Sequence, residues 1–119
     1  MTILAHIALP AAISGATLKA AQASPKCRYC AMGIVGFMGA LPDLLGWLWA
    51  LINDVSMWTY YQTFHAWWMW FLPPAGLHVL MDSWVHYPEG GMIVPIYYIL
   101  EGICWAVSLP LLYYGAKDG

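Results

Sequence analysis

Apolar residues dominate four long stretches of the chain, and polar or helix-breaking residues separate them. The stretches cover approximately residues 2–20, 28–52, 56–85 and 93–114. Charged residues are rare inside them, and none occurs between Val55 and Met81. Because a helix of about 20 apolar residues crosses the hydrocarbon core of a bilayer, the pattern predicts three to four transmembrane helices.

Proline and turn residues mark where these helices are expected to begin, bend and end. The markers are the polar break 22–25 ending in Pro25, a kink at Pro42, an N-cap at Ser56, a break at Pro73-Pro74, a turn at 87–91, Pro95 in the first turn of the last helix and Pro110 near its end. A closed barrel is excluded because so few segments cannot close one. We therefore expect an all-α membrane bundle.

The third stretch is too long for one straight membrane helix. Residues 57–85 would extend about 43 Å at 1.5 Å per residue, against a hydrocarbon core of about 30 Å. A break at Pro73-Pro74 shortens this reach. The sequence leaves open whether the stretch crosses once with a bend or turns back at the two prolines.

Composition strengthens the membrane interpretation. Hydrophobic residues make up 62% of the 119 residues and charged residues 8%, whereas soluble domains average about 45–50% and 25%. Too little polar surface is available for a free soluble monomer, and the absence of a basic tract argues against a nucleic-acid partner. We expect one membrane-embedded helical domain spanning residues 1–119, or a hydrophobic subunit buried in a larger assembly.

The basic residues suggest an orientation. Lys19, Lys26 and Arg28 surround the first connection, and the positive-inside rule places such a loop in the cytoplasm. The N-terminus would then face the opposite side. We expect the first stretch to belong to the mature protein, because it contains His6 and Pro10 and lacks a preceding basic segment typical of a signal peptide.

Six ionisable residues interrupt the apolar stretches, each at a cost of about 2.5–3.5 kcal/mol at a helix centre. They are His6, Asp43, His65, His78, Asp82 and Glu101. His78 and Asp82 are four residues apart and share a helix face. Imidazole and carboxylate groups are ligands for zinc or manganese. We therefore expect Asp43, His65, His78 and Asp82 to converge inside the bundle, with His6 as a fifth member.

The same residues also have a structural interpretation that needs no metal ion. A single histidine in an apolar helix is more often a hydrogen-bonded core residue than a ligand. His6 would face solvent near the N-terminus, and Asp82 would pair with His86 at a membrane surface.

Four short motifs together resemble the YdjM-like inner-membrane metal-dependent hydrolases. They read AHIALPAAISG, GFMGALPDLLGWL, YYQTFHAWW and LHVLMDSWVHYPEGG, in the order found in that family. The resemblance implies that His6, Asp43, His65, His78 and Asp82 match the family's metal ligands. The chain departs from the family pattern at Leu45, which replaces a second Asp, at Tyr60, which replaces a His, and at Ala66, which replaces a Ser.

The resemblance implies a membrane-embedded hydrolase in a bacterial inner membrane, acting on a lipid-like ester or phosphodiester. A divalent ion, expected to be zinc, would lower the pKa of a bound water, with Asp43 or Asp82 as the catalytic general base. The expected partners are the lipid bilayer and other membrane subunits or further copies of the chain. The alternative is a non-enzymatic accessory subunit of a larger membrane complex.

Cysteines, aromatics and glycines leave further alternatives open. Cys27-x-x-Cys30 would be a redox pair, half a zinc site, a palmitoylation site or a chance pairing, and Cys104 is the third cysteine. The aromatic residues between Phe64 and Phe71 would cover all faces of a helix and pack against lipid, subunits or a pigment. Gly33, Gly36 and Gly39 predict a narrow face for close helix packing.

Overall fold

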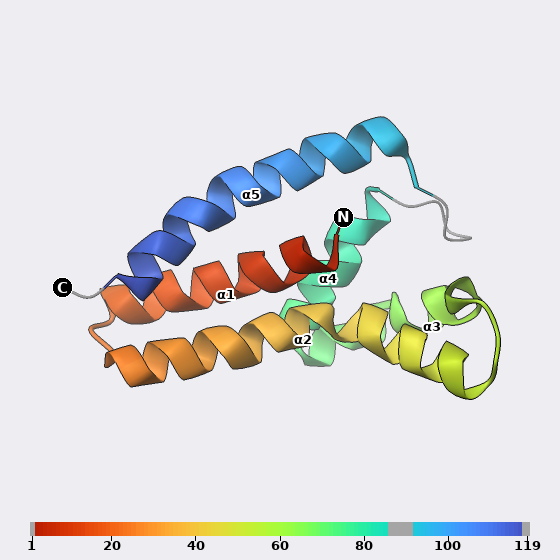
Figure 1. Cartoon of the computed structure of the whole chain (residues 1–119), viewed down its shortest axis with the longest axis horizontal. Coiled ribbons are helices and arrows are strands. Elements are labelled where there is room, and N and C mark those ends of the chain that lie inside the picture. Colours follow the sequence, from red (N-terminus) through yellow and green to blue (C-terminus); the bar gives the residue numbers. More distant parts are fainter. Residues whose placement is uncertain (1, 86–91, 118–119) are drawn as a thin grey trace.

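Three long helices lie side by side and form most of the molecule (Figure 1). A computed structural model describes residues 2–85 and 92–117. The long helices are α1 (Ile3–Ala20), α2 (Pro25–Ile52) and α5 (Val94–Ala116). Shorter elements gather near one end of the bundle: the 3₁₀ helix η1 (Met57–Tyr60), α3 (Tyr61–Phe64), the 3₁₀ helix η2 (Trp67–Phe71) and α4 (Pro73–Ser83). The predicted all-α fold is confirmed.

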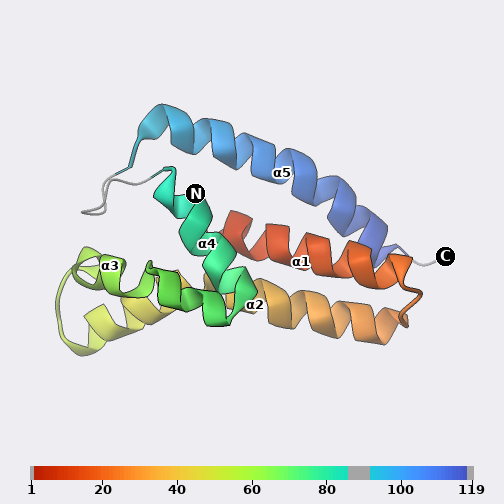
Figure 2. The same ribbon diagram turned by 180° about the vertical axis from the view of Figure 1, so that it is seen from behind.

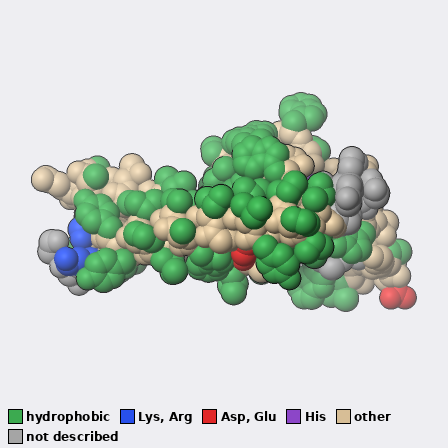
Figure 3. Space-filling model, turned by 90° about the horizontal axis from the view of Figure 1, so that it is seen from above, with side chains coloured by type: hydrophobic (Ala, Val, Ile, Leu, Met, Phe, Trp, Pro, Cys, Tyr) green, Lys and Arg blue, Asp and Glu red, His purple; other side chains and the backbone are tan. Residues whose placement is uncertain are grey.

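The three long helices are each long and apolar enough to cross a membrane, as the sequence predicts for a membrane protein. Their outer faces carry large apolar side chains, such as Tyr98 and Ile103 on α5, which are 68% and 55% exposed. Figure 3 shows hydrophobic side chains spread along the length of one face, with Lys and Arg gathered only at one end. Such a surface is suited to lipid contact.

Small residues allow α1 and α2 to pack closely as an antiparallel pair. Gly36 lies against Ile7 and Ala11, and a Cβ added at Gly39 would overlap the carbonyl oxygen of His6. The predicted glycine face is therefore used at two of its three positions, because nothing lies within 4 Å of a Cβ added at Gly33.

Helix α5 runs parallel to α1 on the other side. Near its start, Glu101 accepts hydrogen bonds from the backbone N–H and the hydroxyl of Thr2, at 2.9 and 2.5 Å. Near its end, a Cβ added at Gly115 would lie 2.7 Å from the backbone of Gly15. The end of α5 therefore lies beside the connection between α1 and α2, as both views show (Figures 1 and 2).

Basic side chains hold the ends of these helices together. Arg28 is buried, and its Nε and Nη1 donate hydrogen bonds to the carbonyls of Gly115 and Ala23, both at 2.9 Å. The ammonium group of Lys19 donates to the carbonyl of Lys117 at 2.5 Å. We call the group Lys19, Arg28 and Lys117 the basic end of the bundle.

Most helix boundaries agree with the sequence. Ser24 caps α2 and Pro25 occupies its first turn, so this helix begins three residues before the predicted start. Ser56 accepts a hydrogen bond from the backbone of Trp58, as expected for an N-cap. Helix α2 continues through Pro42, and α5 contains Pro110. The predicted turn at residues 87–91 lies outside the described residues.

The third apolar stretch contains no spanning helix among the described residues, so three of the predicted three to four membrane helices are present. The break before Pro73 is confirmed, because Leu72 is extended. However, residues 57–71 form only short 3₁₀ and α turns, interrupted at His65 and Ala66, so the aromatic residues of this segment do not cover one helix. The start of the stretch lies near the end of the bundle opposite the basic end, whereas α4 lies beside the middle of α2 (Figure 1).

Candidate metal centre

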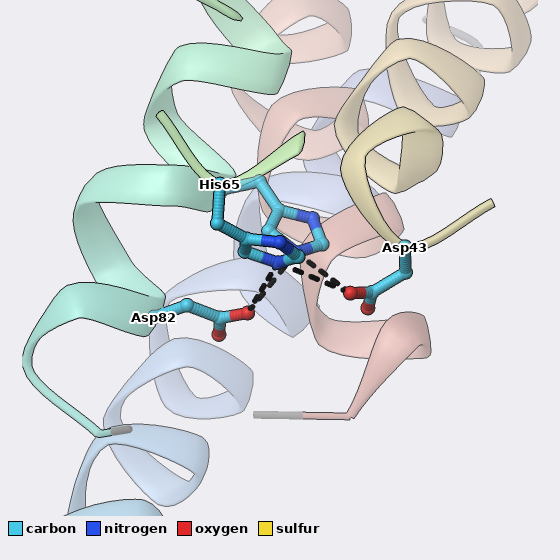
Figure 4. A group of neighbouring side chains, drawn as sticks. Asp43, His65 and Asp82 are labelled. Atoms are coloured by element: carbon cyan, nitrogen blue, oxygen red, sulfur yellow. Dashed lines mark hydrogen bonds and ion pairs between the residues drawn. The ribbon is translucent and has the colours of Figure 1, made fainter. Parts of the chain in front are cut away.

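Four ionisable side chains from three parts of the chain meet beside the start of α1. Asp43 comes from α2, His65 from the residue that ends α3, and His78 and Asp82 from α4. One nitrogen or oxygen atom from each lies within 4.8 Å of the others. Figure 4 shows the carboxylates of Asp43 and Asp82 approaching the imidazole groups from opposite sides. The predicted convergence of these four residues is confirmed; their role as ligands stays a prediction.

The distances within this group suit a shared ion. His65 Nε2 lies 3.2 Å from each of Asp43 Oδ1, Asp82 Oδ2 and His78 Nε2. His78 Nε2 lies 3.4 Å from Asp43 Oδ1 and 3.1 Å from Asp82 Oδ2. Two atoms bonded to one ion at 2.0–2.2 Å lie roughly 2.8–3.6 Å apart for bond angles between 90° and the tetrahedral value. These five distances fall in this interval, and the ligand atoms of all four residues lie within 4.8 Å of one another.

Prolines shape the backbone at two of the contributing segments. Leu72 is extended before Pro73 and Pro74, and α4 begins at Pro73. One helical turn then separates His78 from Asp82 and puts both on one face. In α2, Pro42 has no N–H to donate to the preceding helical turn, and the carbonyl of Gly39 lies in that turn. That carbonyl accepts a hydrogen bond from His78 Nδ1 at 2.6 Å.

Backbone carbonyls fix both histidine rings in the orientation that a metal requires. His78 Nδ1 donates to Gly39, and His65 Nδ1 donates to the carbonyl of Tyr61 at 2.9 Å. Each bond places a proton on Nδ1, so that Nε2 is the nitrogen that can direct a lone pair at the centre of the group when it carries no proton. Histidine ligands almost always donate their second ring nitrogen in this way.

His6 supports the group from one side. Its Nε2 donates a hydrogen bond to Asp82 Oδ1 at 2.8 Å, so that Asp82 Oδ2 faces the other two histidines. Its ring stacks on that of His78, with centroids 3.5 Å apart. Among the described residues, nothing hydrogen-bonds to the buried His6 Nδ1. The structure thus places His6 against Asp82 rather than within the group of four, and it is not solvent-facing.

Charge balance is compatible with a bound cation. Two carboxylates require two positive charges, which either two imidazolium groups or one divalent ion can supply. His78 lies in α4, outside the three spanning helices. Burial lowers the pKa of its imidazole, but hydrogen bonds to Asp43 and Asp82 outweigh burial and raise this pKa to about 9. Protons therefore compete with a metal ion for this site at neutral pH.

The carboxylates of Asp43 and Asp82 differ in solvent exposure. The Asp82 side chain is 3% exposed, whereas that of Asp43 is 28% exposed. Asp43, His65 and Asp82 line a cavity of about 500 Å³ whose other walls are mostly apolar and aromatic, including Trp47 and Trp58. Asp43 is thus the carboxylate best placed to meet a molecule in the cavity.

The remaining candidates lie elsewhere. Glu101 binds Thr2 and Trp105, away from the group of four. Cys27 and Cys30 are exposed at the start of α2, and Cys104 is buried on α5. The pairing of Asp82 with His86 lies outside the described residues. Sequence reasoning missed the cavity, since its aromatic lining comes from separate segments that give no shared local signal.

Comparisons with protein-family models, with curated proteins and with solved structures find no match to this chain.

Proposed function

We propose that this chain is a membrane-embedded hydrolase dependent on one divalent metal ion, held by Asp43, His65, His78 and Asp82. The observation that carries the proposal is the pair of imidazole rings whose Nδ1 atoms are bound to backbone carbonyls while their Nε2 atoms face two carboxylates. Zinc is the proposed ion, because two nitrogen and two oxygen donors suit it. Manganese accepts the same donors.

When bound, such an ion supplies a Lewis acid and lowers the pKa of a coordinated water to near 7. Asp82, held by His6, keeps one oxygen directed at the ion site. Asp43 is the proposed general base, because its carboxylate is the more exposed and faces the cavity. The cavity walls restrict bulk water and orient the substrate.

The resemblance to YdjM-like hydrolases supplies the reaction class for this proposal, and a bacterial inner membrane as the proposed location. The second hypothesis is a non-enzymatic accessory subunit. One observation favours it: Trp67 and Phe71 of η2 are 83% and 66% exposed, and a further protein would cover them.

Metal depletion and reconstitution in detergent test the proposal. We expect the purified full chain to hydrolyse p-nitrophenyl ester or phosphodiester substrates, to lose this activity with a chelator and to regain it with zinc or manganese. Glu101→Gln, which removes a carboxylate outside the group of four, serves as the control and should retain activity. A chain that binds no zinc or manganese, or that binds it without any hydrolysis, would support the accessory-subunit hypothesis.

A further inference from the structure

The cavity beside the metal group is mostly apolar, and no Lys or Arg is among its described lining residues. It measures about 500 Å³, within the usual range for small-molecule sites, and its walls include Leu44, Trp47, Trp58 and Met92. The chain contains only four Lys and Arg residues, and none of them lines this cavity. Among the described lining residues, a molecule that fills it therefore meets mostly apolar side chains, apart from the group of four and the phenol groups of Tyr61 and Tyr97.

The basic side chains are far from the site. Arg28 precedes Asp43 by fifteen residues on α2, which corresponds to about 22 Å along a helix. Lys19 and Lys117 lie with Arg28 at the basic end. If that end faces the cytoplasm, the metal group lies roughly two thirds of the way across a hydrocarbon core of about 30 Å.

Charge then decides which scissile group the site tolerates. A divalent ion with the carboxylates of Asp43 and Asp82 has no net charge. A phosphodiester would add a negative charge in an apolar cavity, where an uncompensated charge is costly; phosphoryl-transfer sites supply Arg, Lys or extra metal ions for this purpose. A carboxylic ester is neutral when it binds, and negative charge develops on its carbonyl oxygen only during reaction.

We infer that the substrate is a neutral carboxylic ester with a long apolar chain, and not a phosphodiester; this inference rests on the proposed hydrolase function. Hydrolysis adds one water molecule across the ester. The water oxygen bonds to the carbonyl carbon, and the bond from that carbon to the alcohol oxygen breaks. One proton is removed by Asp43 and passes to the alcohol oxygen, and the acid product releases another. The apolar chain lies along the aromatic walls of the cavity.

A matched substrate pair tests this inference with the zinc-loaded full chain in detergent. The pair is p-nitrophenyl dodecanoate and dodecyl p-nitrophenyl phosphate, which share the leaving group and the length of the apolar chain. We expect kcat/KM to be at least about 100-fold higher for the ester. We also expect the dodecanoate to exceed p-nitrophenyl butyrate by at least about tenfold, because the shorter chain leaves the apolar walls unfilled.

A charge introduced into the cavity tests the physical reason. Leu44→Arg places a cation in the lining, whereas Leu48→Arg places one on the same helix outside the lining. We expect Leu44→Arg to raise the phosphodiester-to-ester ratio of kcat/KM by at least about tenfold, and Leu48→Arg to leave it unchanged. If Leu44→Arg fails to bind zinc, the ratio of kcat/KM for the two substrates in the wild-type chain still tests the inference.

The outcomes separate the two proposals. Faster hydrolysis of the phosphodiester by the wild-type chain would overturn the neutral-ester inference and leave the metal-dependent hydrolase in place. Zinc binding without hydrolysis of either substrate, or no zinc binding, would overturn both.

Discussion

The two ends of this bundle both bury ionisable side chains, but they satisfy them differently. At the basic end, Arg28 is 5% exposed and donates to carbonyls at the ends of neighbouring segments. At the other end, His78 and Asp82 are 1% and 2% exposed and meet other ionisable side chains.

This difference in hydrogen-bond partners distinguishes a buried residue with a structural role from residues that can bind a ligand. The guanidinium N–H groups of Arg28 donate to carbonyls that a helix end leaves without a partner. The hydrogen-bonding groups joined there need no bound ligand. In the group of four, the Nδ1 protons of His65 and His78 are already used, and lone pairs converge. Lone pairs that face one another require a cation or protons.

The largest expected effect is the loss of metal from Asp82→Asn. Removing this carboxylate takes away one ligand and the charge that two histidines face. We expect zinc affinity to fall by more than about 100-fold, beyond the effect of changing a supporting group. Titration with a chromophoric zinc indicator measures the zinc affinity, and circular dichroism verifies the helix content of the variant.

Glu101→Gln is the matched control, since it removes a carboxylate that binds Thr2 instead. Equal zinc affinity in the Asp82→Asn and Glu101→Gln variants would rule out Asp82 as a ligand.

Gly39→Ala should damage the fold and the site together. The added Cβ overlaps the carbonyl oxygen of His6, and the Gly39 carbonyl itself holds His78. We expect a loss of about 1–3 kcal/mol in the free energy of unfolding, together with weaker zinc binding. Gly33→Ala, at a position with nothing within 4 Å of the new Cβ, should change stability by less than about 1 kcal/mol. Similar losses for both variants would contradict the close α1–α2 contact.

Arg28→Met should lower stability and leave zinc affinity nearly unchanged, whereas Asp82→Asn should lower zinc affinity. It leaves the carbonyls of Gly115 and Ala23 without this donor, and we expect about 1–3 kcal/mol lower stability in detergent. Zinc affinity should stay within about twofold of the wild-type value, because the basic end is remote from the site. A large loss of zinc binding in this folded variant would show that the two ends are coupled.

A graded effect on zinc affinity is expected from pH. The raised pKa of His78, about 9, means that this imidazole is protonated at neutral pH in the metal-free chain. Zinc requires the neutral imidazole, so binding releases a proton and affinity must rise with pH. Between pH 6.5 and 8.5 we expect about a tenfold gain per pH unit, measured by isothermal titration in several buffers. A flat profile would exclude His78 as a ligand.

Much of this fold could be predicted from the residues because membrane constraints act locally. Runs of apolar residues predicted the three long helices, and Pro25 and Pro73-Pro74 marked breaks between helices. The convergence of Asp43, His65, His78 and Asp82 followed from the cost of leaving such groups alone among apolar residues.

Features that depend on tertiary contacts could not be predicted from the sequence. Residues 57–71 have the composition of a helix, yet they fold as short turns around the site, with the carbonyl of Tyr61 held by His65. The placement of His6 beside Asp82 depends on the close approach of α1 to Gly39. Sequence spacing encodes neither the cavity nor the parallel packing of α5 on α1.

X-ray absorption spectroscopy of the zinc-loaded wild-type chain tests the central claim most directly. The account predicts about one zinc per chain, with two imidazole nitrogens and carboxylate oxygens at about 2.0–2.2 Å and no sulfur. A sulfur shell at about 2.3 Å would instead place the ion at Cys27 and Cys30. That result, or a chain that takes up no zinc at all, would contradict a metal centre built from Asp43, His65, His78 and Asp82.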